Sequence, residues 1–542
     1  MRKHRDGVYD VLVVGAGVAG LYAIHTARQT QLNVVCLEAG DGVGGTWYYN
    51  RYPGCRCDVE SIDYSYSFDE ELQREWRWSE RYATQPEILS YLNHVAQRFD
   101  LLPHIRFGER VEQARFDEHR SAWIVQASSG REYRARNIIF ATGSLSTPNI
   151  PAIPGAEHFT GDVYRTAQWP DSTPSFAGKR VAVIGTGSSG IQAIPVVARE
   201  AKSLTVFQRT ANYSVPAFNR TLTNDDYERI VREYPERRRT SRMSGGGSPH
   251  QAHPHNATDV TAEERRAAFE ATWRTGGVLF SKTFPDQNID HTANKYAREF
   301  FEEKIRDIVR DPRTRDDLIP SDHPIGAKRI CTDSGYYETF NRDNVTLVNL
   351  RHEPIEAITA RGILTSAAQY EFDVIIYATG FDALTGTLQR IDIQGAAGMR
   401  LGDVWRNGPL TYLGMQIPGF PNMFIVNGPG SPAVLANMIL TSEQQVSWII
   451  DLIAHCSVIG VQQAEPRRDA AEKWTEHVTE LANGTLLPLA NSWYVGANIP
   501  GKPRTFMLYC GGLGTYTTIC DDVKAAGYEG LVMTSRSQQW AS

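Results

Sequence analysis

Residues 11–20 read Val11-Leu12-Val13-Val14-Gly15-Ala16-Gly17-Val18-Ala19-Gly20, a short apolar run that ends in a glycine-rich turn. A helical pattern follows, and a second apolar run ends in Glu38, 23 residues after the first glycine. Strand, turn, helix, strand and acid in this order form the dinucleotide-binding fingerprint. Gly15, Gly17 and Gly20 let the backbone approach a pyrophosphate, the helix N-terminus attracts the phosphates, and Glu38 is suited to bind ribose hydroxyls.

The same unit recurs after residue 180, where an apolar run leads into Gly185-Thr186-Gly187-Ser188-Ser189-Gly190. The next apolar run ends in Gln208-Arg209-Thr210, without an acid. A carboxylate at this place repels a 2′-phosphate, whereas an arginine binds it, so the second unit should prefer NADP(H). Two such units predict two dinucleotides, FAD at the first and NADPH at the second.

Two further segments, residues 137–143 and 373–380, are apolar strands that both end in Ala-Thr-Gly. Strands of this kind occur in two-dinucleotide flavoproteins where the chain leaves each nucleotide domain. We therefore predict an α/β fold with two Rossmann-like dinucleotide-binding domains and a helical insertion. The expected boundaries are 1–148 and 386–542 for the FAD domain, 149–218 and 326–385 for the NADP domain, and 219–325 for the insertion.

The insertion carries helical signals. Thr261-Ala262-Glu263-Glu264 is a capping box, and Phe269 and Trp273 follow one turn apart. Tyr296, Phe300, Lys304 and Ile308 recur every fourth residue in a helix that we expect Pro312 to close. Residues 244–256 predict an irregular, exposed loop. The alternative is that its histidines, His250, His253 and His255, are metal ligands.

Composition narrows the class of protein. The 542 residues are 41% hydrophobic and 22% charged with a net charge of −6, which excludes a disordered or fibrous chain and disfavours a nucleic-acid partner. No apolar run reaches the ~20 residues of a membrane helix, and the charged start, Met1 to Asp10, shows no signal peptide. The seven cysteines suggest reduced thiols in a cytoplasmic protein, with a redox role for Cys55 and Cys57 as the lesser alternative. No metal motif and no obligate protein partner is indicated, and we expect a monomer.

The loop after the first fingerprint reads Gly44-Gly45-Thr46-Trp47, then Tyr52-Pro53-Gly54, then Asp58. At every fixed position it resembles the first diagnostic motif of the Baeyer–Villiger monooxygenases, NADPH- and FAD-dependent enzymes that use O2 to convert ketones to esters or lactones. A second family motif is matched by Phe159-Thr160-Gly161 and Trp169-Pro170, but Arg165 stands where the family has histidine. Arginine retains a donor and loses the switchable proton, so it either weakens coupling between the domains or is a neutral local variant.

The resemblance extends along nearly the whole chain and implies roles for single residues. Arg329, oriented by Asp58, is the cation beside the C4a-peroxyflavin; Arg209, Thr210 and Lys328 hold the 2′-phosphate of NADP; and Trp493 covers the nicotinamide side. Gly45, Thr46 and Trp47 lie at the flavin. Residues 428–438 are most similar to those of phenylacetone and steroid monooxygenase-like members and place Ala433, Val434, Leu435 and Met438 in the substrate pocket.

Other functions compete with this one. An N-hydroxylating flavin monooxygenase has a similar architecture but needs no Arg329, and an NADPH oxidase would release mainly hydrogen peroxide. A non-enzymatic nucleotide sensor would keep both nucleotide domains. A disulfide reductase is disfavoured because no Cys-x4-Cys follows the first fingerprint.

Overall fold

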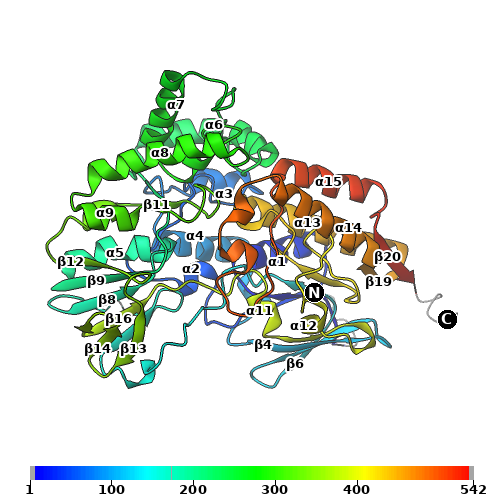
Figure 1. Ribbon diagram of the computed structural model, residues 1–542. Helices are drawn as coiled ribbons and strands as arrows, with labels where there is room; N and C mark the ends of the chain where they lie inside the picture. The colour runs from blue at the N-terminus through cyan, green and yellow to red at the C-terminus, as the bar shows by residue number, and fades with distance from the viewer. Residues whose placement is uncertain (1–6, 173, 536–542) are drawn as a thin grey trace.

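The computed structural model describes residues 7–172 and 174–535. Residues 1–6, on which part of the expectation about a signal peptide depends, lie outside the described residues. The structure confirms the α/β class: two sheets with helices around them form the lower part of the molecule, and a group of helices lies across the top (Figure 1).

The first sheet has eight strands and combines segments from both ends of the chain. β1 lies between β2 and β6 in its parallel part, and β4 and β5 extend it as an antiparallel meander. β17 and β18, both beyond residue 390, pair with β4 and β6, so the last part of the chain returns to this sheet. The strands are β1 (Tyr9–Val14), β2 (Val34–Leu37), β3 (Ile105–Arg106), β4 (Val111–Asp117), β5 (Ala122–Ala127), β6 (Glu132–Phe140), β17 (Asp392–Gln394) and β18 (Met423–Ile425).

The second sheet is parallel throughout, in the order β12-β9-β8-β16-β7. Its central strands are continuous apolar runs because helices and loops cover both faces. The strands are β7 (Asp162–Arg165), β8 (Arg180–Ile184), β9 (Ser203–Gln208), β12 (Val345–Asn349) and β16 (Val374–Tyr377). A small antiparallel sheet of β13 (Ile355–Thr359), β14 (Gly362–Thr365) and β15 (Gln369–Glu371) lies beside it, and β19 (Val461–Pro466) pairs with β20 (Leu531–Ser535).

The helical insertion leaves and rejoins the chain at one place. β10 (Ser214–Pro216) and β11 (Cys331–Asp333) form a parallel ladder with Ser214 opposite Cys331. Between them lie the helices at the top of Figure 1, α6 (Asn224–Met243), α7 (Ala262–Thr275) and α8 (His291–Ile308), followed by α9 (Pro312–Leu318). α7 begins with the predicted capping box, since Thr261 and Glu264 each bond the other's backbone. Residues 328 and 329 therefore lie at the base of the insertion.

Our expectation that Pro312 closes α8 is wrong. α8 ends at Ile308, and the next residue, Val309, is already extended with φ −90° and ψ 118°. Pro312 is instead the first residue of α9, where Asp311 caps the helix by accepting a hydrogen bond from the backbone N–H of Thr314 (2.7 Å). Proline suits this position because the first N–H groups of a helix have no intrahelical partner.

The loop at 244–256 is also less exposed than we expected. Its second half is largely exposed, but its first half packs between the insertion and the C-terminal part of the chain. The backbone N–H of Asn437 donates to the carbonyl of Gly246 (3.0 Å), and that of Leu513 donates to Gly245 (3.1 Å). No group of three metal-ligating side chains occurs in the described residues.

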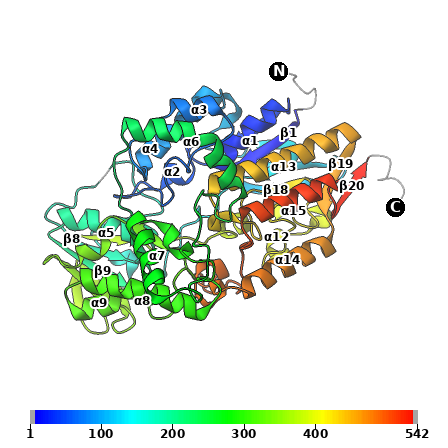
Figure 2. The same ribbon diagram turned by 90° about the horizontal axis from the view of Figure 1, so that it is seen from above.

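Most of the remaining helices cover the first sheet or line the boundary between the halves, as Figure 2 shows from above, whereas α5 packs on β8 and β9 of the second sheet. α1 packs along α13, and the hydroxyl groups of Tyr22 and Ser447 lie 3.0 Å apart between them. No helix in the described ranges is long and apolar enough to span a membrane. These helices are α1 (Val18–Gln29), α2 (Thr46–Tyr49), α3 (Glu70–Glu75), α4 (Gln85–Arg98), α5 (Ser188–Glu200), α10 (Tyr336–Thr339), α11 (Gly386–Gln389), α12 (Leu401–Val404), α13 (Met438–Ile459), α14 (Arg468–Asn483) and α15 (Leu513–Ala525).

Candidate functional site

The turn between β1 and α1 presses the glycines of the first fingerprint against the end of β6. Gly15 has φ +102°, and a Cβ on it would lie 2.7 Å from the carbonyl oxygen of Ala141. A Cβ on Gly20 would lie 1.8 Å from the carbonyl oxygen of Gly15. Glu38, at the end of β2, accepts a hydrogen bond from the backbone N–H of Ala16 (2.7 Å). The turn and the acid thus lie together, in the arrangement that fits the pyrophosphate and ribose of FAD.

The loop that carries Gly45, Thr46 and Trp47 packs directly on this turn. A Cβ on Gly45 would lie 3.0 Å from the Cα of Gly17, and Gly45 has φ +54°. Thr46 and Trp47 begin α2, and the indole N–H of Trp47 donates to the hydroxyl of Tyr64 (3.1 Å). The motif residues and the first fingerprint therefore form one surface.

The second turn repeats the geometry of the first. Gly185 has φ +110°, and a Cβ on it would lie 2.5 Å from the carbonyl oxygen of Ala378, in the second Ala-Thr-Gly segment. A Cβ on Gly187 would meet nothing within 4 Å, so this turn has room for a phosphate. Ser188, Ser189 and Gly190 begin α5. The alanine of each Ala-Thr-Gly segment thus contacts the first glycine of a fingerprint. The similarity of the two segments in sequence did not predict this contact.

Arg209 and Thr210 follow β9, and Lys328 approaches them from the base of the insertion. Thr186 donates to the carbonyl of Thr210 (3.1 Å). Burial lowers the pKa of Lys328; the charge of Asp322 opposes this shift, and the charges of Arg209 and Arg351 add to it. Three cations therefore lie within electrostatic reach of one another, a suitable site for a 2′-phosphate.

Sequence reasoning missed Arg351 and Asp322 in this cationic site. The guanidinium of Arg351 donates from Nε to the carbonyl of Arg209 (3.0 Å) and also pairs with Asp322. Arg351 lies two residues beyond β12, which pairs with β9 so that Asn349 lies opposite Gln208. The strand ends were visible in the sequence, but not that these two strands are neighbours.

Asp58 and Arg329 form a bidentate ion pair between the motif loop and the base of the insertion. Nε of Arg329 donates to Oδ2 of Asp58 (2.6 Å), and Nη2 donates to Oδ1 (2.9 Å). The side chains are 31% and 19% exposed. Burial alone would lower the pKa of Arg329, but the charge and hydrogen bonds of Asp58 outweigh it, and the net pKa is raised. The guanidinium is thus a permanent cation.

The expected substrate-pocket residues reach the same place. Nη1 of Arg329 donates to the carbonyl of Val434 (2.6 Å). Ala433, Val434, Leu435 and Met438 share one hydrophobic cluster with Trp493, which packs edge-on to Tyr494 with ring centroids 4.6 Å apart. Trp493 to Val495 and Ala433 to Leu435 are short 3-10 turns that bring these side chains together.

The sequence also singled out Arg165 and two cysteines, Cys55 and Cys57, of which Cys57 directly precedes Asp58. Arg165 ends β7, beside Tyr377 of β16, with its guanidinium 6.0 Å from the ring centroid. Cys55 and Cys57 are buried free thiols. Burial raises the pKa of Cys55 to about 12 and that of Cys57 well above its usual value, which disfavours the reactive thiolates that the redox alternative needs.

Comparison with known proteins accounts for this arrangement. Residues 12–245 match the family described as pyridine nucleotide-disulphide oxidoreductase. A Baeyer-Villiger monooxygenase of Pseudooceanicola batsensis is 41% identical over 97% of this chain and 96% of its own length. A phenazine N-monooxygenase of Lysobacter antibioticus is 40% identical over 97% of each chain. The solved structure of oxidized steroid monooxygenase bound to NADP is 54% identical, with a TM-score of 0.94 over 97% of this chain and 100% of that one. This chain belongs to the Baeyer–Villiger monooxygenase family.

Proposed function

We propose that the protein uses NADPH and O2 to oxidise ketones to esters or lactones, with FAD at the first glycine turn and NADP(H) at the second. Bound FAD supplies the oxygen-activating chemistry, and NADPH supplies the hydride. The observation that carries the proposal is the Asp58–Arg329 pair, which joins the motif loop to the substrate loop through Val434.

Arg329 is placed to stabilise negative charge on the reacting oxygen. A guanidinium has five N–H groups, of which Asp58 and Val434 occupy three, so two remain for the reacting atoms. Asp58 keeps the planar group in one orientation. Preorganised donors of this kind stabilise a transition state without reorganising during the reaction.

Other residues of the chain bind NADP(H) and shield the reaction site from water. Arg209, Thr210 and Lys328 hold the 2′-phosphate, and Arg351 fixes Arg209 through its carbonyl. Trp493 closes the nicotinamide side next to the apolar segment at 433–438 and helps to exclude water. We further propose that the enzyme is a cytoplasmic monomer without an obligate partner. Light scattering of the purified protein would test the monomeric state.

N-hydroxylation is the second candidate, because a relative of similar identity is named a phenazine N-monooxygenase. The decisive experiment incubates the holoenzyme with NADPH, O2 and a panel of cyclic, aryl, long-chain and steroid ketones, with phenazine as the N-oxidation substrate. We expect a mass increase of one oxygen and an ester or lactone from at least one ketone. Exclusive N-oxide formation, or complete release of hydrogen peroxide with every ketone, would refute the proposal.

A further inference from the structure

Lys282 lies at the end of the 3-10 turn η3 (Val278–Lys282) in the helical insertion and has no role in the function above. Its backbone is held on both sides. Phe280 is fully buried, Thr283 is 3% exposed, and the carbonyl of Lys282 contacts Nε2 of His250 (3.1 Å). The side chain therefore starts from a rigid base.

The ammonium group of Lys282 lies against the loop next to the substrate segment. A Cβ on Gly246 would come within 2.5 Å of Nζ, so the lysine passes close to this glycine. The carbonyl of Gly246 accepts a hydrogen bond from the backbone N–H of Asn437 (3.0 Å), which directly precedes Met438. The ammonium and the apolar cluster at 433–438 thus adjoin each other.

Lys282 is not neutralised within the described part of the chain, where it forms no ion pair with a carboxylate. Burial lowers its pKa, and the positive charge of Arg329 lowers it further, with no carboxylate opposing the shift. Arg329 is already matched by Asp58. Lys282 is partly buried and within electrostatic reach of Arg329, so this region carries one positive charge in excess, and an anion that paired with the ammonium would offset its partial desolvation.

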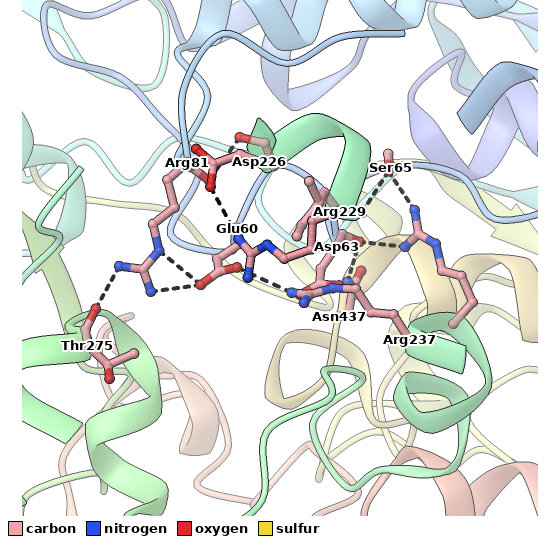
Figure 3. Close-up of polar contacts among 12 residues, drawn as sticks. Glu60, Asp63, Ser65, Arg81, Asp226, Arg229, Arg237, Thr275 and Asn437 are labelled. Carbon is pink, nitrogen blue, oxygen red and sulfur yellow. Dashed lines mark hydrogen bonds and ion pairs between the residues drawn. The ribbon is translucent and has the colours of Figure 1, made fainter. Parts of the chain in front are cut away.

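A network of ion pairs fixes the insertion in place. Arg237 of α6 donates to Asp63 through Nε (2.7 Å) and Nη2 (2.6 Å), and Arg81 donates to Glu60 (2.7 Å) and to the carbonyl of Thr275 at the end of α7 (2.7 Å). Figure 3 shows these side chains converging from the insertion and from the loop after Asp58. The network thus ties α6 and the end of α7 to the loop that follows Asp58, the partner of Arg329.

The same network reaches the substrate segment. The side-chain amide of Asn437 donates to the carbonyl of Asp63 (2.7 Å), while its oxygen caps α13 at Ile439 (3.0 Å). Hydrogen bonds thus join the insertion, the loop after Asp58 and the start of α13, and Figure 3 shows Asn437 beside Asp63 and Arg237.

We propose that Lys282 binds an anionic group of the substrate, a carboxylate in the simplest case. Arg329 then stabilises the reacting oxygen at the ketone end of the same molecule. The enzyme then prefers ketones that carry a carboxylate at a distance from the carbonyl. The inference rests on the proposed function. Pairing with a carboxylate would offset the desolvation of the ammonium, whereas a neutral ketone leaves it unpaired.

The test compares two matched ketones, 4-phenyl-2-butanone and its para-carboxylate, in the wild-type holoenzyme and in Lys282→Met and Lys282→Arg. We expect the ratio of kcat/KM for carboxylate over neutral ketone to fall at least about tenfold in Lys282→Met, through KM, and to be largely restored in Lys282→Arg. The matched control is Lys295→Met, an exposed lysine of α8 (69% exposed), which should change the ratio by less than about twofold.

An unchanged ratio in Lys282→Met would overturn the proposal. An equal loss with both ketones would do so as well, because it would place Lys282 at the reacting oxygen or the nicotinamide cofactor. Calorimetric binding of the para-carboxylate to the NADP-loaded holoenzyme gives a readout without turnover. Binding that weakens at least about tenfold in Lys282→Met, in an enzyme that forms no ester, would support the anion site and refute the proposed oxidation.

Discussion

Asp58→Asn should separate oxygen transfer from NADPH consumption. The substitution keeps the shape of the side chain but removes its charge and turns one acceptor toward Arg329 into a donor. The carboxylate now accepts two hydrogen bonds, of 2.6 Å and 2.9 Å. Arg329 would keep one of them and its bond to Val434, and it would lose its fixed orientation.

The exposure of the pair sets the size of the effect. Removing one partner of a fully buried pair costs about 3–5 kcal/mol, and an exposed pair contributes up to ~1 kcal/mol. With side chains 31% and 19% exposed, this pair lies between these limits. A loss of ~2 kcal/mol in transition-state stabilisation, as the pair ceases to orient Arg329, corresponds to a decrease of about 30-fold in the rate of ester formation.

The assay measures ester by gas chromatography, NADPH by absorbance and hydrogen peroxide by a coupled peroxidase in the same reaction. We expect NADPH consumption to fall much less than ester formation, with peroxide making up the difference. The control is Asp403→Asn, which removes a surface pair with Arg406 whose side chains are 60% and 73% exposed. The reasoning fails if Asp58→Asn keeps the wild-type ester yield per NADPH, or if the control loses as much.

Four further outcomes concern the cofactor sites. Arg209→Ala should raise the steady-state KM for NADPH at least about tenfold relative to the KM for NADH. An unchanged preference for NADPH would contradict the 2′-phosphate assignment. Arg351→Ala should raise KM for NADPH by about threefold to tenfold with little change for NADH, because Arg351 only supports Arg209 through its carbonyl. Equal effects on both cofactors would argue against this role. Because its pKa is lowered, Lys328 is charged at low pH and loses its charge at a lower pH than an ordinary lysine does. As the pH rises toward the ordinary lysine pKa, KM for NADPH should therefore increase, whereas KM for NADH should not. Gly20→Ala should abolish FAD retention or folding, since its Cβ would lie 1.8 Å from a backbone oxygen; a flavin-loaded variant with the wild-type melting temperature would refute this.

The local patterns of the sequence were sufficient for the class of fold. A fingerprint is encoded within about 30 residues, because strand, turn and helix depend on neighbouring side chains and on glycine's freedom at positions such as Gly15 and Gly185. The motif loop after it identified the family for the same reason. Even there, local reasoning misjudged Pro312, since proline both ends helices and begins them.

Only the tertiary structure decided which distant residues act together. Asp58 and Arg329 are 271 positions apart, and in the sequence only the family resemblance pairs them. Arg351 became a neighbour of Arg209 because β12 lies beside β9, and Lys282 came to adjoin the substrate segment because the insertion folds back over the motif loop. Strand order and domain packing depend on the burial of whole surfaces, which no short stretch of sequence specifies. That Lys282 forms no ion pair with a carboxylate of the described residues likewise depends on the three-dimensional placement of every group around it.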